Sequence, residues 1–459
     1  MRCCHFCSYG VRAGGGGGVS SHGGVLSERV DVIKGGLMVV GSTASSNING
    51  DVGSNVSVGV REANDKGAAG RKFSHGVGAL KDDNKDLEGV LLDDFVKSMD
   101  EALLCCSSHK DNKEVREVFF SLKDNKAPGP DGYSAGFFKK AWSIVGEEVT
   151  HAILSFFETG KLLKVVNTTT IVLIPKVPNP SSVKDFRPIS CCNTIYKCIS
   201  KIIANRIKVV LSDLVGPCQS AFVASRNISD NILFSQELLR NYHLDSGSPR
   251  CALKVDLMKA YDTVRWDFIV EILRLSGFPS HVVDWIWACM STPKFSVSVN
   301  REVNGFFSSS RGLRQGDPMS PYLFVLAMEA LSGLLGIMAS NKEFRYHWRC
   351  EKDEITHLCF ADDLLVFSRA DVQSVRLVKE CLDQFRYLSG LIPNPGKSDF
   401  FVCGVTSASR MELLSASGFT KRCLPVRYLG VPLISNWLIA SDCRVLVDRI
   451  INRAKGWTS

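Results

Sequence analysis

The chain has 459 residues, of which 45% are hydrophobic and 22% are charged, and its formal net charge is +8. This length is too great for one compact core and predicts two or three lobes. The composition is that of an ordinary globular protein, and no uninterrupted apolar run of about eighteen residues occurs, so a membrane span is not expected. The small basic excess is compatible with a polyanionic partner but does not identify one.

Residues 1–88 are the first distinct segment. They contain five consecutive glycines at 14–18, many Ser and Asn residues, and few aromatic residues. Such a composition buries too little apolar surface to offset the loss of chain entropy on folding. We therefore expect a disordered, Gly/Ser-rich, low-complexity leader, and no function is inferred for it.

Residues 89–157 are expected to form a helical N-terminal extension. Apolar residues recur at helical spacing over 87–104 and again over 137–157. Between these stretches, residues 125–132 read NKAPGPDG, and four of the eight are Pro or Gly. This density of Pro and Gly predicts a defined loop.

From residue 171 onward, short strand-like runs alternate with helical segments. This mixture predicts an α+β lobe built on an antiparallel sheet. The predicted strands are 171–174, 251–257, 295–299, 357–360 and 364–367, and the predicted helices are 195–211, 228–242, 266–275, 322–338 and 374–388.

The most informative residues are 360–367, which read FADDLLVF. Asp362 and Asp363 lie between two strand-like runs, which predicts a β-hairpin with two carboxylates at its tip. Two adjacent carboxylates repel each other and are stabilised by a strong cation. Mg²⁺ suits them, because it takes oxygen ligands and bridges carboxylates to phosphates. A plain solvated turn is the alternative, since Asp is common in turns.

Asp256 is a third candidate carboxylate, because it lies near the end of the strand predicted at 251–257. If that strand pairs with the hairpin, we expect Asp256 to face Asp362 across the sheet. Three carboxylates there could hold two metal ions about 4 Å apart, which is the arrangement used for in-line nucleotidyl transfer.

Taken in order, these segments resemble the motif series of reverse transcriptases from LINE-type (non-LTR) retrotransposons, in particular the plant type. The resemblance covers roughly residues 122–458 and does not extend to the leader. The matching segments are 126–132 (KAPGPDG), 173–177 (LIPKV), 185–190 (DFRPIS), 219–222 (QSAF) with 228–232 (ISDNI), 254–262 (KVDLMKAYD), 311–321 (RGLRQGDPMSP), 360–363 (FADD), 389–391 (SGL) with 394 and 397–398, and 428–432 (YLGVP).

The resemblance implies a right-hand polymerase fold. Residues 158–434 would form the reverse transcriptase domain of fingers and palm, and 435–459 the start of a truncated thumb. The implied activity is RNA-directed DNA polymerisation, in which dNTPs are added to the 3′-hydroxyl of a DNA primer on an RNA template. Asp256 and Asp362 would bind two Mg²⁺ ions, or Mn²⁺, and Asp363 would support the site.

Three more residues acquire dNTP-binding roles from the resemblance. Tyr261 matches the sugar gate, whose ring would collide with a ribose 2′-hydroxyl, although it could instead be a core aromatic at the start of a helix. Arg187 matches a fingers residue that contacts the triphosphate through its planar fork of donors, although Asp185 is a ready ion-pair partner. Lys176 is a weaker candidate for the same contact.

Gln315 and Gly316 match a turn that lies beside the nascent base pair, where glycine lets the backbone approach a ligand closely. Lys397 matches a lysine that could donate a proton to pyrophosphate, although it could equally be a solvated side chain. Asp262 is expected to cap or brace the following helix rather than bind metal.

Three alternatives remain open. No upstream endonuclease region or C-terminal zinc motif is recognisable, so the chain is expected to be a fragment or a degenerate copy, and it could be a non-catalytic relic that at most binds nucleic acid. An RNA-directed RNA polymerase would share the metal chemistry, but Tyr261 and Ala361 argue against it. A domesticated nucleic-acid-binding protein would leave the carboxylates unexplained.

The 17 cysteines follow no disulfide framework, and no secretory signal precedes them. Free thiols in a reducing compartment are the simpler expectation, which predicts an intracellular protein of the nucleus or cytoplasm. The sequence does not indicate an oligomeric state.

Overall fold

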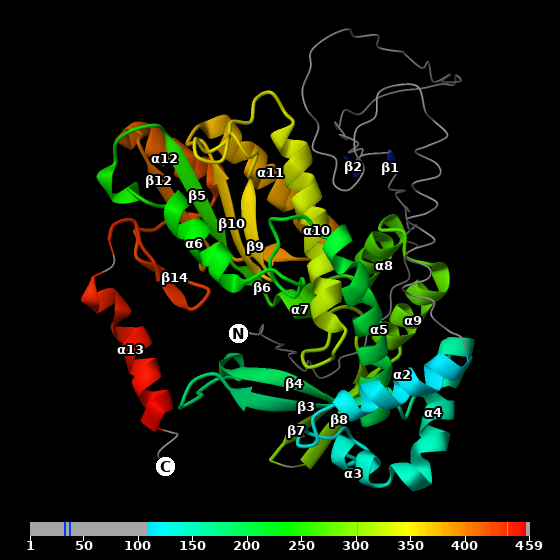
Figure 1. Ribbon diagram of the computed structural model, residues 1–459. Coiled ribbons are helices and arrows are strands. Elements are labelled where there is room, and N and C mark those ends of the chain that lie inside the picture. The colour runs from blue at the N-terminus through cyan, green and yellow to red at the C-terminus, as the bar shows by residue number, and fades with distance from the viewer. Residues whose placement is uncertain (1–31, 34–35, 38–107, 301, 438, 456–459) are drawn as a thin grey trace, which may run out of the picture. The chain divides into compact units, whose positions relative to one another are not determined.

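The computed structural model describes residues 32–33, 36–37, 108–300, 302–437 and 439–455 (Figure 1). The chain divides into two units, Gly14–Glu88 and the remainder. In the smaller unit, β1 (Val32–Ile33) pairs antiparallel with β2 (Gly36–Leu37). The rest of the predicted leader at 1–88, and the helix predicted at 87–104, lie outside the described residues and stay predictions.

Four helices in the larger unit share one core. Ile199, Ile203 and Ile207 recur every four residues on the longest of them and are buried, as an amphipathic helix requires. The helix predicted over 137–157 is divided in two, because Ala141 leaves the helical conformation, ending one helix and beginning the next. The four helices are α2 (Ser108–Ser121), α3 (Ala135–Lys140), α4 (Trp142–Thr159) and α5 (Thr194–Leu214).

The Pro/Gly loop at 125–132 is fixed to the start of α5. A Cβ atom on Gly129 would lie 2.0 Å from Asn193 Oδ1, so only glycine allows this close approach. Asn193 Oδ1 also accepts a hydrogen bond from the Asp131 amide (3.3 Å), and Lys197 Nζ donates to Ala127 O (2.6 Å). These contacts give the loop a defined conformation.

A four-stranded sheet has the order β4-β3-β7-β8. β3 (Thr168–Pro175) and β4 (Phe186–Cys192) form an antiparallel hairpin, and β7 (Lys294–Val299) pairs antiparallel with β8 (Glu302–Ser308). β3 and β7 pair in parallel, which differs from the predicted antiparallel sheet. Parallel strands need a long connection between them. Here the chain between β3 and β7 includes α5 and a strand at 250–255 that belongs to another sheet.

The second large sheet has five strands in the order β13-β12-β5-β10-β9. β5 lies at its centre and pairs antiparallel with β10 on one side and β12 on the other. β12 and β13 were not among the predicted strands. The strands are β5 (Arg250–Val255), β9 (His357–Phe360), β10 (Asp363–Ser368), β12 (Asp399–Cys403) and β13 (Thr420–Lys421).

The two faces of the five-stranded sheet bury different side chains. Leu253 and Leu364 belong to the large core, which includes residues of α8, α10 and α11. Ala252 and Leu365 alternate with them along the strands and join a second cluster with Leu238 of α6. Figure 1 shows α6 in front of the sheet and the more distant α11 behind it. These helices are α6 (Ile228–Leu238), α8 (Trp266–Leu275), α10 (Ser320–Ala339) and α11 (Val372–Ser389).

Helix α10 is long and apolar enough to cross a membrane when judged by length and composition alone. Phe324, Leu331 and Leu335 are nevertheless buried in the core, where α10 packs on α5, α8 and α11. Core packing therefore accounts for the hydropathy of α10, which also contains the carboxyl group of Glu329. Burial raises the pKa of Glu329 to about 7.

Most of the remaining described elements are short, and the helix at 280–291 adds buried residues to the large core. The cysteines among the described residues are free. The elements are η1 (Val183–Asp185), η2 (Tyr242–Leu244), β6 (Leu257–Met258), α7 (Ala260–Thr263), α9 (Ser280–Ser291), β11 (Ile392–Pro393), α12 (Ser407–Ser417), β14 (Val426–Tyr428), β15 (Val431–Leu433) and α13 (Ala440–Lys455).

Candidate active site

The predicted carboxylate hairpin is formed by β9 and β10. Asp363 is the first residue of β10 and pairs with Phe360, while Asp362 lies in the turn between the strands. β5 lies alongside β10, with Val255 opposite Leu364. The same register places Asp256, the next residue after Val255, beside Asp363. The expectation that Asp256 faces Asp362 is therefore wrong by one residue, because β10 begins at Asp363 and leaves Asp362 in the turn.

The three carboxylates are half-buried at one end of the central strands. Oxygen donors of this kind are the ligands that Mg²⁺ takes, so the residues fit this ion in their chemistry. Among the described residues, no three His, Cys, Asp or Glu side chains are already close enough to hold one ion. Like charges repel, so carboxylates favour separation until a cation neutralises them.

The backbone of Asp256 is held by the segment that follows α11. Ser398 Oγ accepts a hydrogen bond from the Asp256 amide (3.1 Å), and the Asn394 amide donates to Asp256 O (2.7 Å). Asn394 Nδ2 lies 3.4 Å from Asp256 Oδ2 and donates to it. These contacts bring the turn that carries Lys397 next to the carboxylates. Lys397 itself is exposed.

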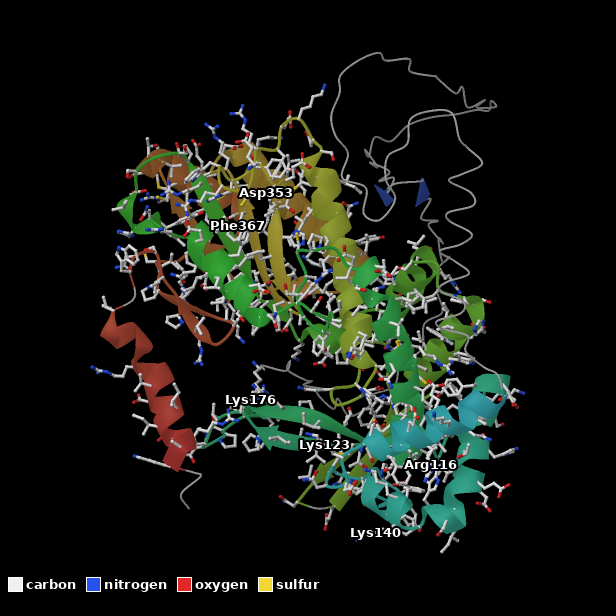
Figure 2. All side chains as sticks on the ribbon, in the orientation of Figure 1. Arg116, Lys123, Lys140, Lys176, Asp353 and Phe367 are labelled. Carbon is white, nitrogen blue, oxygen red and sulfur yellow. The ribbon has the colours of Figure 1, made fainter. Side chains whose placement is uncertain are left out.

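Three of the predicted nucleotide-binding cations are electrostatic neighbours. The pKa of Lys176 is lowered, first by burial and then by the positive charges of Arg187 and Lys397. The carboxylates of Asp185 and Asp262 act in the opposite direction. Figure 2 shows Lys176 on the hairpin formed by β3 and β4, far along the chain from Lys397. The fold therefore brings Lys176 within electrostatic range of Arg187, Lys397 and Asp262.

Arg187 lies on β4, opposite Ile174 of β3. Its Nε atom is buried and has no hydrogen-bond partner among the residues described. The carboxylate of Asp185 is occupied by the amides of Ser181 (3.0 Å) and Ser182 (2.9 Å), which lower its pKa. Among the described residues, Asp185 and Arg187 form no ion pair, so the alternative in which Asp185 neutralises Arg187 is not supported.

Tyr261 lies in the short helix α7, shortly after Asp256. Its ring stacks on Phe324 of α10, with centroids 4.9 Å apart and an interplanar angle of 18°. The side chain is half-buried, so it both packs on the core and keeps an accessible edge. Its carbonyl oxygen accepts a hydrogen bond from the Leu313 amide (2.6 Å), which ties α7 to the loop containing Gln315.

Gln315 and Gly316 occupy the loop before α10. Gln315 is 5% exposed, and within the described part of the chain neither its Oε1 nor its Nε2 has a hydrogen-bond partner. Its carbonyl oxygen accepts from the Ser190 amide (2.8 Å). Gly316 has φ +108, and a Cβ atom there would lie 3.1 Å from Ser190 O. The loop thus requires glycine and contains a buried amide with unused hydrogen-bonding capacity.

Arg314 and Asp317 bracket this turn and were not singled out from the sequence. Arg314 Nη2 lies 3.2 Å from Asp317 Oδ2, and both side chains are almost fully buried. The guanidinium lies 3.9 Å from the ring centroid of Tyr196 and donates to Asn167 Oδ1 (2.7 Å). Asp317 also accepts from the hydroxyls of Tyr196 (2.6 Å) and Ser200. The sequence did contain a signal for this ion pair, because Arg314 and Asp317 carry opposite charges on either side of Gln315-Gly316.

A cavity of about 320 Å³ lies between the four-stranded sheet and this loop. Its wall is largely apolar and includes Leu173, Trp266, Met290 and Phe295. The three carboxylates do not line it. It is therefore separate from the carboxylate-bearing hairpin of β9 and β10, although Arg314 and Asp317 are among its lining residues.

Comparisons with known proteins identify related chains. Residues 174–433 match the family described as "Reverse transcriptase (RNA-dependent DNA polymerase)". The chain is similar to the "Transposon TX1 uncharacterized 149 kDa protein" of Xenopus laevis, with 25% identity over 344 residues, 72% of this chain and 25% of that protein. It is also similar to the "Retrovirus-related Pol polyprotein from type-2 retrotransposable element R2DM" of Drosophila melanogaster, with 27% identity over 348 residues, 73% of this chain and 31% of that protein.

A shorter match is to an uncharacterized mitochondrial protein of Arabidopsis thaliana, with 45% identity over 75 residues, 14% of this chain and 54% of that protein. Among solved structures, apo telomerase from Candida tropicalis matches with a TM-score of 0.39 and 12% identity, covering 60% of this chain and 57% of that one. The chain spans only 25% and 31% of the lengths of the frog and fly proteins.

Proposed function

The chain belongs to the reverse transcriptase (RNA-dependent DNA polymerase) family, and from this premise we propose that it is the polymerase core of a LINE-type, non-LTR retroelement. Its reaction is the transfer of dNTPs onto a primer 3′-hydroxyl. The observation that carries the proposal is the register of β5 and β10, which places Asp256 beside Asp363 with Asp362 in the adjoining turn. The local identity with the Arabidopsis protein favours the plant type.

Asp256, Asp362 and Asp363 would hold two divalent ions, Mg²⁺ or Mn²⁺, which when bound activate the primer hydroxyl and stabilise the leaving pyrophosphate. Arg187 and Lys176 would bind the triphosphate by charge-assisted hydrogen bonds. The remaining catalysis is positioning of the primer and the dNTP in line with each other.

Gln315, Gly316 and Lys397 would complete the nucleotide site. The buried amide of Gln315 has no partner among the residues that the structure describes, so a hydrogen bond to the incoming nucleotide would satisfy it. Gly316 would let the backbone approach the new base pair. Lys397 would donate a proton toward pyrophosphate. The partners are an RNA template and a DNA primer, and the proposed compartment is intracellular, in the nucleus or cytoplasm.

The test is primer extension by the purified chain on a DNA primer annealed to RNA. We expect incorporation of dNTPs with Mg²⁺ or Mn²⁺, complete loss on chelation with EDTA, and recovery when Mg²⁺ is added back. Binding of the primed template without incorporation under either ion would contradict the proposal. That result would assign the alternative function, a relic that only binds nucleic acid.

Tyr261 provides a test of sugar selection. Replacing Tyr261 with Ala removes the ring beside the nucleotide site and is expected to raise incorporation of rNTPs relative to dNTPs by about 10- to 200-fold, the range that steric fit in a pocket provides. The measurement is the ratio of kcat/KM values for a matched rNTP and dNTP. Tyr261→Phe keeps the ring and the stack on Phe324, so it should keep the wild-type ratio. A folded Tyr261→Ala variant with unchanged selectivity would leave Tyr261 only a packing role.

A further inference from the structure

β9, the first strand of the carboxylate hairpin, is the edge strand of its sheet. Residues 218–220 cover that edge: the Cys359 amide donates to Cys218 O (2.8 Å), and the Ser220 amide donates to Cys359 O (3.0 Å). Gln219 and Cys359 thus form a one-residue parallel bridge. Residues 219–222 were among the segments that resemble the family motifs, but the resemblance assigned no role to Gln219.

The side chain of Gln219 reaches from this bridge to the turn of the hairpin. It is 1% exposed, and its Oε1 accepts hydrogen bonds from the amides of Ala361 (3.0 Å) and Ala221 (2.9 Å). Its Nε2 lies 3.1 Å from Cys359 Sγ and donates to it. One buried carboxamide therefore joins the covering segment, strand β9 and the turn.

The Ala361 amide is the contact that bears on the carboxylates. Ala361 has φ +56, a left-handed conformation that is unfavourable for any residue other than glycine. Asp362 is the next residue, so the orientation of the Ala361 peptide fixes where the Asp362 backbone begins. Without Gln219 Oε1, the amide of Ala361, itself the residue in the unfavourable conformation, would lose its partner, and the turn would be free to relax.

We infer that Gln219 is a positioning residue, which fixes the turn carrying Asp362 and Asp363 and thereby sets the affinity of the site for divalent ions. The inference rests on the proposed function, because it takes these carboxylates to be metal ligands. Groups that orient the ligands of a metal commonly change affinity by about 10- to 100-fold when removed.

The test is Gln219→Met, which preserves length and burial but accepts no hydrogen bond from either amide. Two measurements on purified protein without substrate are compared with wild type. Hydrogen exchange of the peptide containing Ala361 is expected to accelerate about tenfold or more. The dissociation constant for Mn²⁺, measured by electron paramagnetic resonance, is expected to rise about 10- to 100-fold. If Gln219→Met does not fold, Gln219→Asn keeps the carboxamide but is one methylene too short to reach.

Two reference variants separate the possible outcomes. Ile153→Ala removes fully buried volume from α4 and should lower stability without changing Mn²⁺ affinity. Asp362→Asn removes a proposed ligand and should weaken Mn²⁺ binding. Unchanged exchange at Ala361, or faster exchange with wild-type Mn²⁺ affinity, would overturn the inference alone. Equal Mn²⁺ binding by wild type and Asp362→Asn would overturn the proposed function itself.

Discussion

Replacing Asp362 with Asn is expected to reduce dNTP incorporation on a primed RNA template by about a thousandfold or more. Metal ions contribute several kcal/mol of charge stabilisation to such transfers, and each 1.4 kcal/mol or so changes a rate about tenfold. Asparagine has the shape of aspartate but carries no charge, so it weakens the ligand while leaving the hairpin of β9 and β10 folded. Asp256→Asn should behave in the same way, because Asp256 lies beside the same strand end.

The measurement is single-turnover primer extension at saturating Mg²⁺. Asp353→Asn is the matched control, because Asp353 is an exposed carboxylate that Figure 2 shows at the opposite end of the sheet from the turn. It should retain wild-type rates. If Asp362→Asn retained more than a tenth of the wild-type rate, the assignment of Asp362 as a metal ligand would have to be abandoned.

Replacing Arg314 with Met is expected to lower the free energy of unfolding by about 3–5 kcal/mol, the usual effect of removing one partner of a buried ion pair. The Asp317 side chain is 2% exposed and would be left without its cation. The interaction with the Tyr196 ring and the hydrogen bond to Asn167 would be lost together. The measurement is urea unfolding followed by circular dichroism, with the thermal midpoint as a second readout.

The same substitution at Arg311 is the control. Arg311 is exposed, so Arg311→Met should change stability by no more than about 0.5 kcal/mol. The double variant Arg314→Met, Asp317→Leu removes the unpaired charge and should recover part of the lost stability. Equal shifts for Arg311→Met and Arg314→Met would show that the buried pair contributes little to the fold.

Local patterns in the sequence predicted the hairpin and the strand near whose end Asp256 lies. Alternation and the flanking apolar runs are properties of a few consecutive residues, so β5, β9 and β10 fall close to their predicted bounds. The pairing register depends on where each strand begins. Because β10 begins one residue earlier than predicted, Asp363 rather than Asp362 lies beside Asp256. The α+β class and the family were likewise accessible from sequence.

Contacts that depend on distant residues could not be predicted in this way. β12, which pairs with β5, is an exception, because its apolar run at 400–403 is a local strand signal that the prediction missed. Arg314 contacts Asn167 and Tyr196, which are more than 100 residues away in the sequence, so no local pattern indicates these contacts. Gln219 is a second example. The motif match included this residue, but it did not predict the hydrogen bond that its Oε1 accepts from the Ala361 amide. The roles proposed for Lys176, Arg187 and Lys397 remain predictions, although the fold brings these cations together.

The parallel pairing of β3 with β7 also determines an order of events during synthesis. In the four-stranded sheet, Ile171 of β3 pairs with Val297 of β7, and β7 leaves the ribosome long after β3 and β4. Until then, the β3–β4 hairpin exposes an unpaired edge of β3, which is a template for association with other chains. A nascent or prematurely terminated chain that stops before β7 is therefore expected to aggregate or require a chaperone, whereas chains that extend past β8 can close the sheet themselves.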